Sequence, residues 1–397
     1  MSSIPYTAEE EALVKALLKM KSVKEFLAEI GVSKSTATKL AQKLADTLGV
    51  VHPIQLVTLH YAERNELGLS KYSLLIERGL ARKLKGAGLR WSVMAPSRFG
   101  TGLLLETGSK RLDELMNLQT SRVAGIYGPY GAGKTQLGLS IAGRVITPGG
   151  NTMYARGSVL IIDFERAIRP ERLEEIVETV ARERGAKDVN AADLVMRRII
   201  YITPDLSKMI LLSISLMPLL WLETWRRFLK IEVSNLPYNP SELEEMFGYV
   251  PDVPLRFVII DGISQAAIAE GFSMLWALTG EKEQLQVKAQ KSQLIRKVFY
   301  NFQRLYAPMF NVAMYTTFQI RSKFSGGTKN WEPAASPVML HNVHILAEIV
   351  RKSMSFSRSK KEIREGKVTS EVKVIKGARV GATTIEVYEG GIRDAED

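Results

Sequence analysis

Residues 122–143, RVAGIYGPYGAGKTQLGLSIAG, contain the segment that decides the class of fold. An apolar run leads into a loop that fully matches the pattern GxxxxGK followed by Ser or Thr, and a helix-forming stretch comes next. Glycines let backbone N–H groups close around phosphate oxygens, and the start of the next helix adds partial positive charge. The loop therefore predicts a nucleotide phosphate site made of Gly128, Pro129, Tyr130, Gly131, Ala132, Gly133, Lys134, Thr135 and Gln136.

Nucleotide chemistry at such a loop also needs a metal site and a group that orients water. Lys134 is expected to reach the β- and γ-phosphates, and the Thr135 hydroxyl to bind Mg²⁺. A carboxylate at the end of a buried strand should complete the metal site, and Asp261, after the apolar run FVII, meets that need. Glu165 lies two residues beyond Asp163, so the alternation of a strand would place both carboxylates on one side. Glu165 is therefore the candidate for orienting the attacking water, with a surface ion-pair partner as the alternative.

The apolar run that precedes this loop is one of several similar runs in the chain. Short apolar, β-branched runs recur along the chain and helical stretches separate them, at 122–128, 158–165, 198–203, 256–262 and 311–319. Near-continuous hydrophobic strands that alternate with helices are typical of a parallel sheet covered on both faces. The fold class predicted is α/β, with a mostly parallel sheet.

The chain before this region has a different character. Residues 1–85 read as short helices with few strand-like alternations. Segments centred on Gly31 and Gly68 each consist of a helix, a glycine turn and a second helix, which Ser33 or Ser70 can cap. Paired helices of this kind often present backbone N–H groups and lysines to DNA phosphates. A small bundle with a solvated basic face is the alternative.

The first helix and the domain boundaries can also be placed. Thr7 followed by Glu10 matches a capping box, in which each side chain accepts a free backbone N–H at the helix start. Residues 86–105 contain glycines and a proline with weak periodicity, so they are interpreted as a linker. The predicted domains are the helical module 1–85 and a core over 106–397.

Composition and charge narrow the class of partner. The chain of 397 residues is 46% apolar and 24% charged, values that exclude global disorder, and it has no cysteine and hence no disulfide or thiolate metal site. Its 54 Lys+Arg against 42 Asp+Glu give a net charge of +12, which favours a polyanionic partner, either nucleic acid or an acidic membrane surface, with a scattered solubilising surface as the alternative. The apolar run Met209–Leu222 is shorter than the ~20 residues that span a bilayer, so it is interpreted as a buried helix. No secretory signal pattern is visible, and a cytoplasmic protein with no membrane partner is expected.

Several segments, taken together, resemble the RecA-type recombinases, most closely the archaeal RadA branch. In the family's order they are ETGSKRLDELM (106–116), GPYGAGKTQ (128–136), IIDFERAIRPERL (161–173), FVIIDG (257–262), NVAMYTTFQ (311–319) and GGIRDAED (390–397). The resemblance implies a RecA-like ATPase core, preceded by a small all-α helix-hairpin-helix domain. It also implies that Lys134 acts on the phosphates, Glu165 is the catalytic glutamate, Asp261 is associated with the metal, and Gln319 senses the γ-phosphate.

The same resemblance implies how the protein meets DNA. In the family, ATP binds between protomers of a helical filament, and two loops grip single-stranded DNA. Those loops would be about 263–284 and 320–342 here. Cations paired with aromatic faces suit single-strand binding. The implied DNA-binding residues are Lys282 in the first loop and Arg321, Lys323, Phe324, Lys329 and Trp331 in the second.

Several departures from the family pattern stand out. Gly262 replaces the usual serine, and LTGEKE (278–283) replaces an arginine-bearing glycine turn. KVIKGARVGA (373–382) stands where the family has an acidic cap over the neighbour's ATP, so Lys373, Lys376 or Arg379 is a candidate contact to phosphates of a neighbouring protomer, with Lys376 as the main one. The interval between Thr203 and Asp261 is longer than usual.

Three functions remain open on the sequence. The first is a DNA-dependent ATPase, using ATP and Mg²⁺, that binds single-stranded and double-stranded DNA and self-associates into a filament or ring. Such a recombinase would carry out homologous pairing and strand exchange in DNA recombination and the repair of DNA damage. The second is a RadA paralogue that acts as a mediator, binding ATP and another recombinase without strand exchange. The third is an ATP-switched structural filament.

Overall fold

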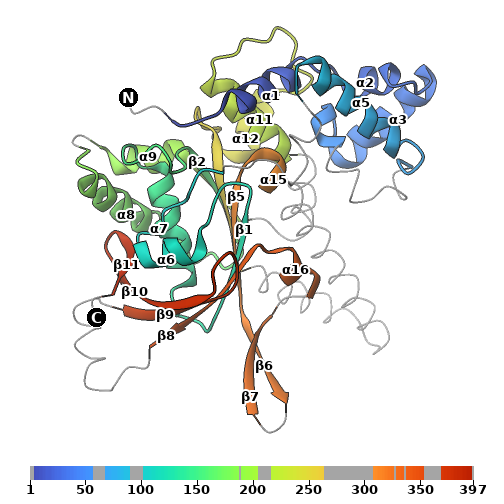
Figure 1. The fold of residues 1–397 in the computed structure, drawn as a ribbon. Helices are drawn as coiled ribbons and strands as arrows, with labels where there is room; N and C mark the ends of the chain where they lie inside the picture. The colour runs from blue at the N-terminus through green and yellow to red at the C-terminus, as the bar shows by residue number, and fades with distance from the viewer. Residues whose placement is uncertain are drawn as a thin grey trace.

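A computed structural model of the chain describes most of its residues (Figure 1). The described ranges are 4–56, 68–89, 102–186, 189–203, 216–262, 307–325, 328–334, 337–352 and 368–395.

A nine-stranded sheet forms the centre of the body, in the order β11-β10-β9-β8-β1-β5-β4-β2-β3. The run from β8 to β3 is parallel throughout, whereas β9, β10 and β11 are added antiparallel at one edge. This arrangement confirms the predicted α/β fold with a mostly parallel sheet. The strands are β1 (Val123–Tyr127), β2 (Ser158–Asp163), β3 (Ile199–Ile202), β4 (Leu255–Asp261), β5 (Ala313–Phe318), β8 (Ile345–Arg351), β9 (Val368–Lys376), β10 (Gly381–Tyr388) and β11 (Gly391–Asp394).

Helices cover both faces of the sheet because its inner strands are apolar on both sides. Ile161 and Ile259 belong to the core shared with α7 (Lys134–Ile146), α8 (Pro170–Glu183) and α9 (Ala191–Arg198). Ile162 and Ile260, one residue further along each strand, belong to the opposite core with α11 (Met217–Phe228) and α12 (Pro240–Phe247). Alternate residues of one strand therefore pack into two separate cores on opposite faces of the sheet, as strand geometry requires. Short helices α6 (Lys110–Met116), α15 (Ala307–Phe310) and α16 (Pro337–Asn342) complete the body.

The apolar run that invited a membrane interpretation is buried where the structure describes it. Its residues from Met217 onward form the start of α11, whose first nine residues are all buried. Among the described residues, no helix combines the length and the apolar character needed to cross a membrane.

A two-stranded hairpin extends away from the body (Figure 1). It consists of β6 (Ile320–Ser325) and β7 (Thr328–Pro333), which pair antiparallel with each other and not with the large sheet. Because β6 begins two residues after β5 ends, the hairpin is attached directly to a central strand.

The amino-terminal module is helical, as predicted, and contains α1 (Ala8–Leu18), α2 (Val23–Glu29), α3 (Lys34–Leu48) and α5 (Ser73–Gly86). The capping box is confirmed, since Thr7 N–H donates to Glu10 at 2.9 Å and Glu10 N–H donates to Thr7 at 3.1 Å. Gly31 has a φ of 102° in the turn between α2 and α3, a conformation that favours glycine. Ser33 caps α3 as expected.

The prediction that Ser70 caps the last helix of the module is wrong. Helix α5 begins only at Ser73, so Tyr72 occupies the capping position and makes no side-chain cap. Whether the module is a helix-hairpin-helix domain, and whether the chain divides at 85 and 105, stay predictions.

Candidate nucleotide-binding site

The phosphate loop connects β1 to α7, in the predicted strand–loop–helix order. Gly133 has a φ of 101° and directly precedes α7, whose first residue is Lys134. At Gly128 a Cβ atom would lie only 2.0 Å from the Ile349 carbonyl oxygen, so any larger residue would push the loop off β8. Ser370 on β9 donates to the Ala132 carbonyl at 2.9 Å and fixes the loop from the other side. The loop is thus held in one shape by the strands behind it.

Lys134 lies inside this loop with its amine already oriented. Its Nζ donates to the carbonyls of Gly128 and Pro129, both at 3.0 Å. Burial lowers the pKa of Lys134, and the charges of Glu165 and Asp261 oppose that shift. The amine therefore lies between the loop backbone and the two predicted site carboxylates.

Thr135, on α7, contacts Asp261, the last residue of β4. The Thr135 hydroxyl donates to Asp261 Oδ2 at 2.9 Å. Asp261 ends β4 and is buried, which raises its pKa to about 6; Glu165 and Asp163 add to the shift, while hydrogen bonds from Thr317 and Thr135 oppose it. In the described part of the chain no three His, Cys, Asp or Glu side chains gather around a metal-sized site. Two hard oxygen donors fit Mg²⁺, which usually keeps several waters and takes few protein ligands when it also binds phosphates.

Glu165 reaches the site by a turn and not by strand alternation, so that part of the sequence interpretation is wrong. Strand β2 ends at Asp163, whose carboxylate accepts the backbone N–H groups of Glu165, Arg166 and Ile168 at 2.9, 2.8 and 3.1 Å. Arg166 follows with a φ of 54°. A side chain that satisfies three backbone donors competes with the strand ladder and ends it.

Glu165 and Gln319 are brought together, although 154 positions separate them in sequence. Gln319 Nε2 donates to Glu165 Oε1 at 2.8 Å. Gln319 lies between β5 and the hairpin strand β6, so this hydrogen bond links the hairpin's root to the phosphate site. Gly262, which has a φ of 73°, leaves room for Glu165, because a Cβ at 262 would lie 2.3 Å from Glu165 Cγ.

The expected DNA-binding residues of the second loop share the hairpin. Arg321, Lys323 and Phe324 lie on β6, and Lys329 and Trp331 lie on β7. The register pairs Phe324 with Lys329 and Ser322 with Trp331. Lys282 and the rest of the first predicted loop lie outside the described residues.

Lys376 has a partner within its own chain. Its Nζ donates to the carbonyls of Leu340 and His341, at 3.2 and 2.9 Å, at the end of α16. Here the lysine satisfies two carbonyls at a helix end, where cations are favourable.

Three residues of the site were not predicted from the sequence. Thr317 donates to Asp261 Oδ1 at 2.5 Å and accepts the Gly262 N–H at 2.8 Å. Tyr201 donates to Asp163 at 2.9 Å, and Tyr315 donates to the Lys134 carbonyl at 2.6 Å. The sequence signal for Thr317 was its place in a pair of threonines within the otherwise apolar strand β5, and no known motif includes that pair.

Thr317→Val should destabilise the protein by about 2 kcal/mol, because it leaves a buried carboxylate oxygen and a buried N–H without their partner. Thr316→Val is the matched control. The Thr316 hydroxyl is buried and finds no partner in the described part of the chain, so its removal should be neutral or stabilising. Urea unfolding of the two variants measures the difference. Equal losses would show that Thr317 contributes only packing.

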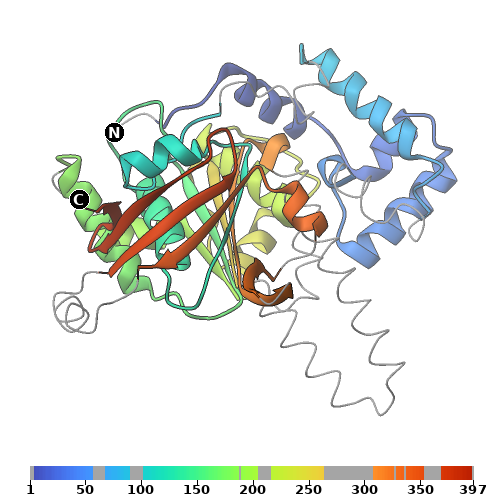
Figure 2. The same ribbon diagram turned by 60° about the horizontal axis from the view of Figure 1, so that its bottom comes forward.

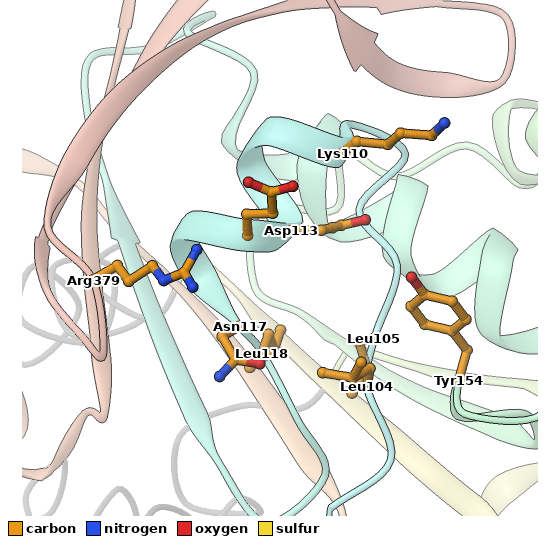
Figure 3. Close-up of a pocket in the computed structure, with 9 residues that line it drawn as sticks. Leu104, Leu105, Lys110, Asp113, Asn117, Leu118, Tyr154 and Arg379 are labelled. Carbon is orange, nitrogen blue, oxygen red and sulfur yellow. The ribbon is translucent and has the colours of Figure 1, made fainter.

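A separate pocket of about 480 Å³ lies elsewhere on the body (Figure 3). Its lining includes residues of α6, the segments on both sides of that helix, Tyr154, and Arg379, which follows β9. Asp113 lies in its wall, and burial raises the pKa of this residue to about 7. The pocket shares no residue with the phosphate loop, so it is not part of the nucleotide site.

Comparison with known proteins agrees with this geometry. The sequence model of the Rad51 family matches residues 101–208, which include the phosphate loop and Glu165. The DNA repair and recombination protein RadA of Aeropyrum pernix is 24% identical over 304 residues, 74% of this chain and 73% of RadA. The family match and this similarity support a place for the chain in the RecA-type recombinase superfamily. The meiotic recombination protein DMC1/LIM15 homolog of Mus musculus is 22% identical over 343 residues, 86% of this chain and 85% of that protein.

Proposed function

We propose that this protein is an ATP-dependent recombinase that binds single-stranded DNA, forms nucleoprotein filaments and promotes homologous pairing and strand exchange in recombination and repair. The observation that carries the proposal is the hydrogen bond from Gln319 to Glu165 at the root of the hairpin. It connects the group assigned to hydrolysis with the element assigned to DNA.

Each residue of the site then has a role in ATP hydrolysis. Lys134 exchanges its two loop carbonyls for the β- and γ-phosphates. Thr135 and Asp261 hold Mg²⁺, which would neutralise charge on the phosphates. Glu165 orients the attacking water, and Gln319 exchanges Glu165 for the γ-phosphate when ATP binds.

The hairpin and the amino-terminal module supply the DNA contacts. The hairpin sequence interleaves Arg321, Lys323 and Lys329 with Phe324 and Trp331. Cations neutralise the phosphates of a single strand, and base stacking on aromatic rings contributes ~1–3 kcal/mol per base. The module's lysines, in helices paired about a glycine turn, suit the phosphates of double-stranded DNA.

Self-association is supported by the edge of the large sheet. Among the described strands, β3 pairs only with β2, so no described strand occupies its other side. Tyr201 on β3 is 42% exposed, and Met196 just before it is 75% exposed. An edge strand beside exposed apolar side chains suits the addition of a strand from a second copy. The proposed units are a helical module over 1–85, a linker over 86–105 and an ATPase core over 106–397.

A recombination mediator, binding ATP and another recombinase without strand exchange, is the second candidate. The contacts of Lys376 favour the mediator. In the family this part of the chain covers the ATP of a neighbouring protomer, whereas here Lys376 donates to carbonyls at the end of α16 in its own chain.

ATP turnover with and without single-stranded DNA, measured beside electron microscopy of the same samples, tests the proposal. DNA-stimulated hydrolysis together with long filaments is the expected result. No stimulation and no filaments would overturn the recombinase and leave the mediator. Filaments with negligible turnover would indicate an ATP-switched scaffold.

A further inference from the structure

Helix α1 lies on the ATPase body as well as on the amino-terminal module (Figures 1 and 2). It packs against α11 of the body and against α5 of the module. Helices α11 and α12 belong to the stretch between β3 and β4, which is longer than the family pattern and has no part in the proposed chemistry. The contact between α1 and α11 therefore gives this stretch a structural role, which is to pack against the first helix of the chain.

An ion pair between Glu10 and Arg256 forms the centre of this contact. Arg256 Nη1 and Nη2 donate to the two carboxylate oxygens of Glu10, at 2.5 and 3.2 Å. The two side chains are 0% and 3% exposed. Asn311 adds a third hydrogen bond to Glu10 at 2.7 Å, and the Pro5 carbonyl accepts from Arg256 Nη2 at 2.9 Å. Segments more than 240 residues apart in sequence thus share one buried polar cluster.

The cluster cannot be opened without a large penalty. Burial by itself would raise the pKa of Glu10, but the charge and hydrogen bonds of Arg256, with help from Asn311, lower it overall. Glu10 is therefore ionised at neutral pH, and removing it would leave the guanidinium of Arg256 buried without a counter-charge.

Aromatic rings enclose the ion pair. Arg256 Cζ lies 4.9 Å from the ring centroid of Trp225 on α11. The Tyr6 ring, just before α1, packs edge-on against Trp225 at 6.1 Å and Phe228 at 5.5 Å. Cation–π and edge-to-face contacts of this kind add to the burial of apolar area.

The opposite end of α1 is fixed to the module and to the same stretch of the body. His52 Nδ1 accepts the Ile54 N–H at 3.0 Å, so its Nε2 carries the proton and donates to the Leu17 carbonyl at 3.1 Å. The His52 ring lies edge-on 6.1 Å from Tyr238, whose hydroxyl donates to Glu223 of α11 at 3.2 Å. Helix α1 is thus enclosed between the module and residues 217–254.

We propose that α1 and residues 217–256 form a joint that holds the amino-terminal module in one orientation on the ATPase body, so that the two move as one unit. Within the described residues, one apolar cluster runs from α1, α3 and α5 through α11 into the sheet. Rotation of the module would require the buried ion pair to break. For DNA binding, a consequence that rests on the proposed function, the joint keeps the module and the hairpin at a constant separation, which sets their effective concentration for one DNA molecule.

A distance measurement in the full-length protein tests the joint without ATP or DNA. Since the chain contains no cysteine, Lys39→Cys on α3 and Glu178→Cys on α8 introduce two unique, exposed positions for spin labels. The unmodified joint should give a single narrow distance distribution. Glu10→Gln should broaden it and speed amide exchange in α1 by about tenfold or more. Glu11→Gln is the control on the same helix, since Glu11 pairs only with Lys15 among the described contacts, and it should match the parent.

A second variant separates loss of the joint from loss of folding. Glu10→Leu combined with Arg256→Met replaces the pair by apolar side chains and should restore the narrow distribution, because no buried charge is left uncompensated. A broad distribution in the parent protein, or a narrow one in Glu10→Gln, would overturn the joint. Neither outcome bears on ATP turnover or filament formation, so the recombinase proposal is tested independently.

Discussion

Lys134→Ala is expected to abolish ATP turnover, with a fall of at least ~100-fold. The Lys134 amine already lies within the phosphate loop, 3.0 Å from two of its carbonyls. Alanine removes the positive charge that would neutralise the β- and γ-phosphates and leaves the loop backbone as the main phosphate ligand. Steady-state phosphate release at saturating ATP and Mg²⁺ measures the effect, and binding of a fluorescent ATP analogue measures the accompanying loss of affinity.

Lys110→Ala is the matched control for this variant. Lys110 is an exposed lysine at the start of α6, beside the pocket of Figure 3 and not in the phosphate loop. Its removal should leave turnover at the parental level. Retained turnover in Lys134→Ala, with a normal unfolding curve, would contradict the assignment of the phosphate loop.

The part of the site that depends on strand order was predictable from sequence. Apolar runs followed by Thr135 and Asp261 indicated two elements of one parallel sheet, and the carboxyl ends of parallel strands meet at one edge. The structure places these side chains 2.9 Å apart. The contact between Gln319 and Glu165 was not predicted from strand order: Gln319 was named only through the family resemblance, and β4 lies between β5 and β2, the strands after which the two residues follow.

Contacts made by side chains to the backbone, or between distant segments, were not predictable. Asp163 looked like one more residue of a strand, and its three N–H partners appear only once the chain has turned. Thr317 resembles its neighbour Thr316 in sequence, yet only one of the two hydroxyls faces Asp261. The pairing of Glu10 with Arg256 depends on how the module packs on the body, about which no local pattern carries information.

Glu165→Gln should lower ATP turnover by ~10²–10³-fold while ATP binding is retained. The amide keeps the size of the carboxylate and an oxygen that can still accept from Gln319, so the site should keep its shape. It loses the negative charge that, under the proposed function, would orient the attacking water. Because this loss acts in the transition state, the rate of hydrolysis should fall with little change in ATP affinity. Single-turnover hydrolysis and equilibrium nucleotide binding separate the two quantities.

Glu171→Gln is the control, an exposed glutamate in the first turn of α8, and it should hydrolyse ATP at the parental rate. If the recombinase proposal holds, Glu165→Gln should also persist in its ATP-bound form. Since that form is the one proposed to grip DNA, its filaments on single-stranded DNA should outlast those of the parent in electron micrographs taken after ATP is added. Normal ATP turnover in Glu165→Gln would mean that another group orients the attacking water. Lost turnover together with lost ATP binding would mean that Glu165 holds the site together, and would remove it from the chemical step.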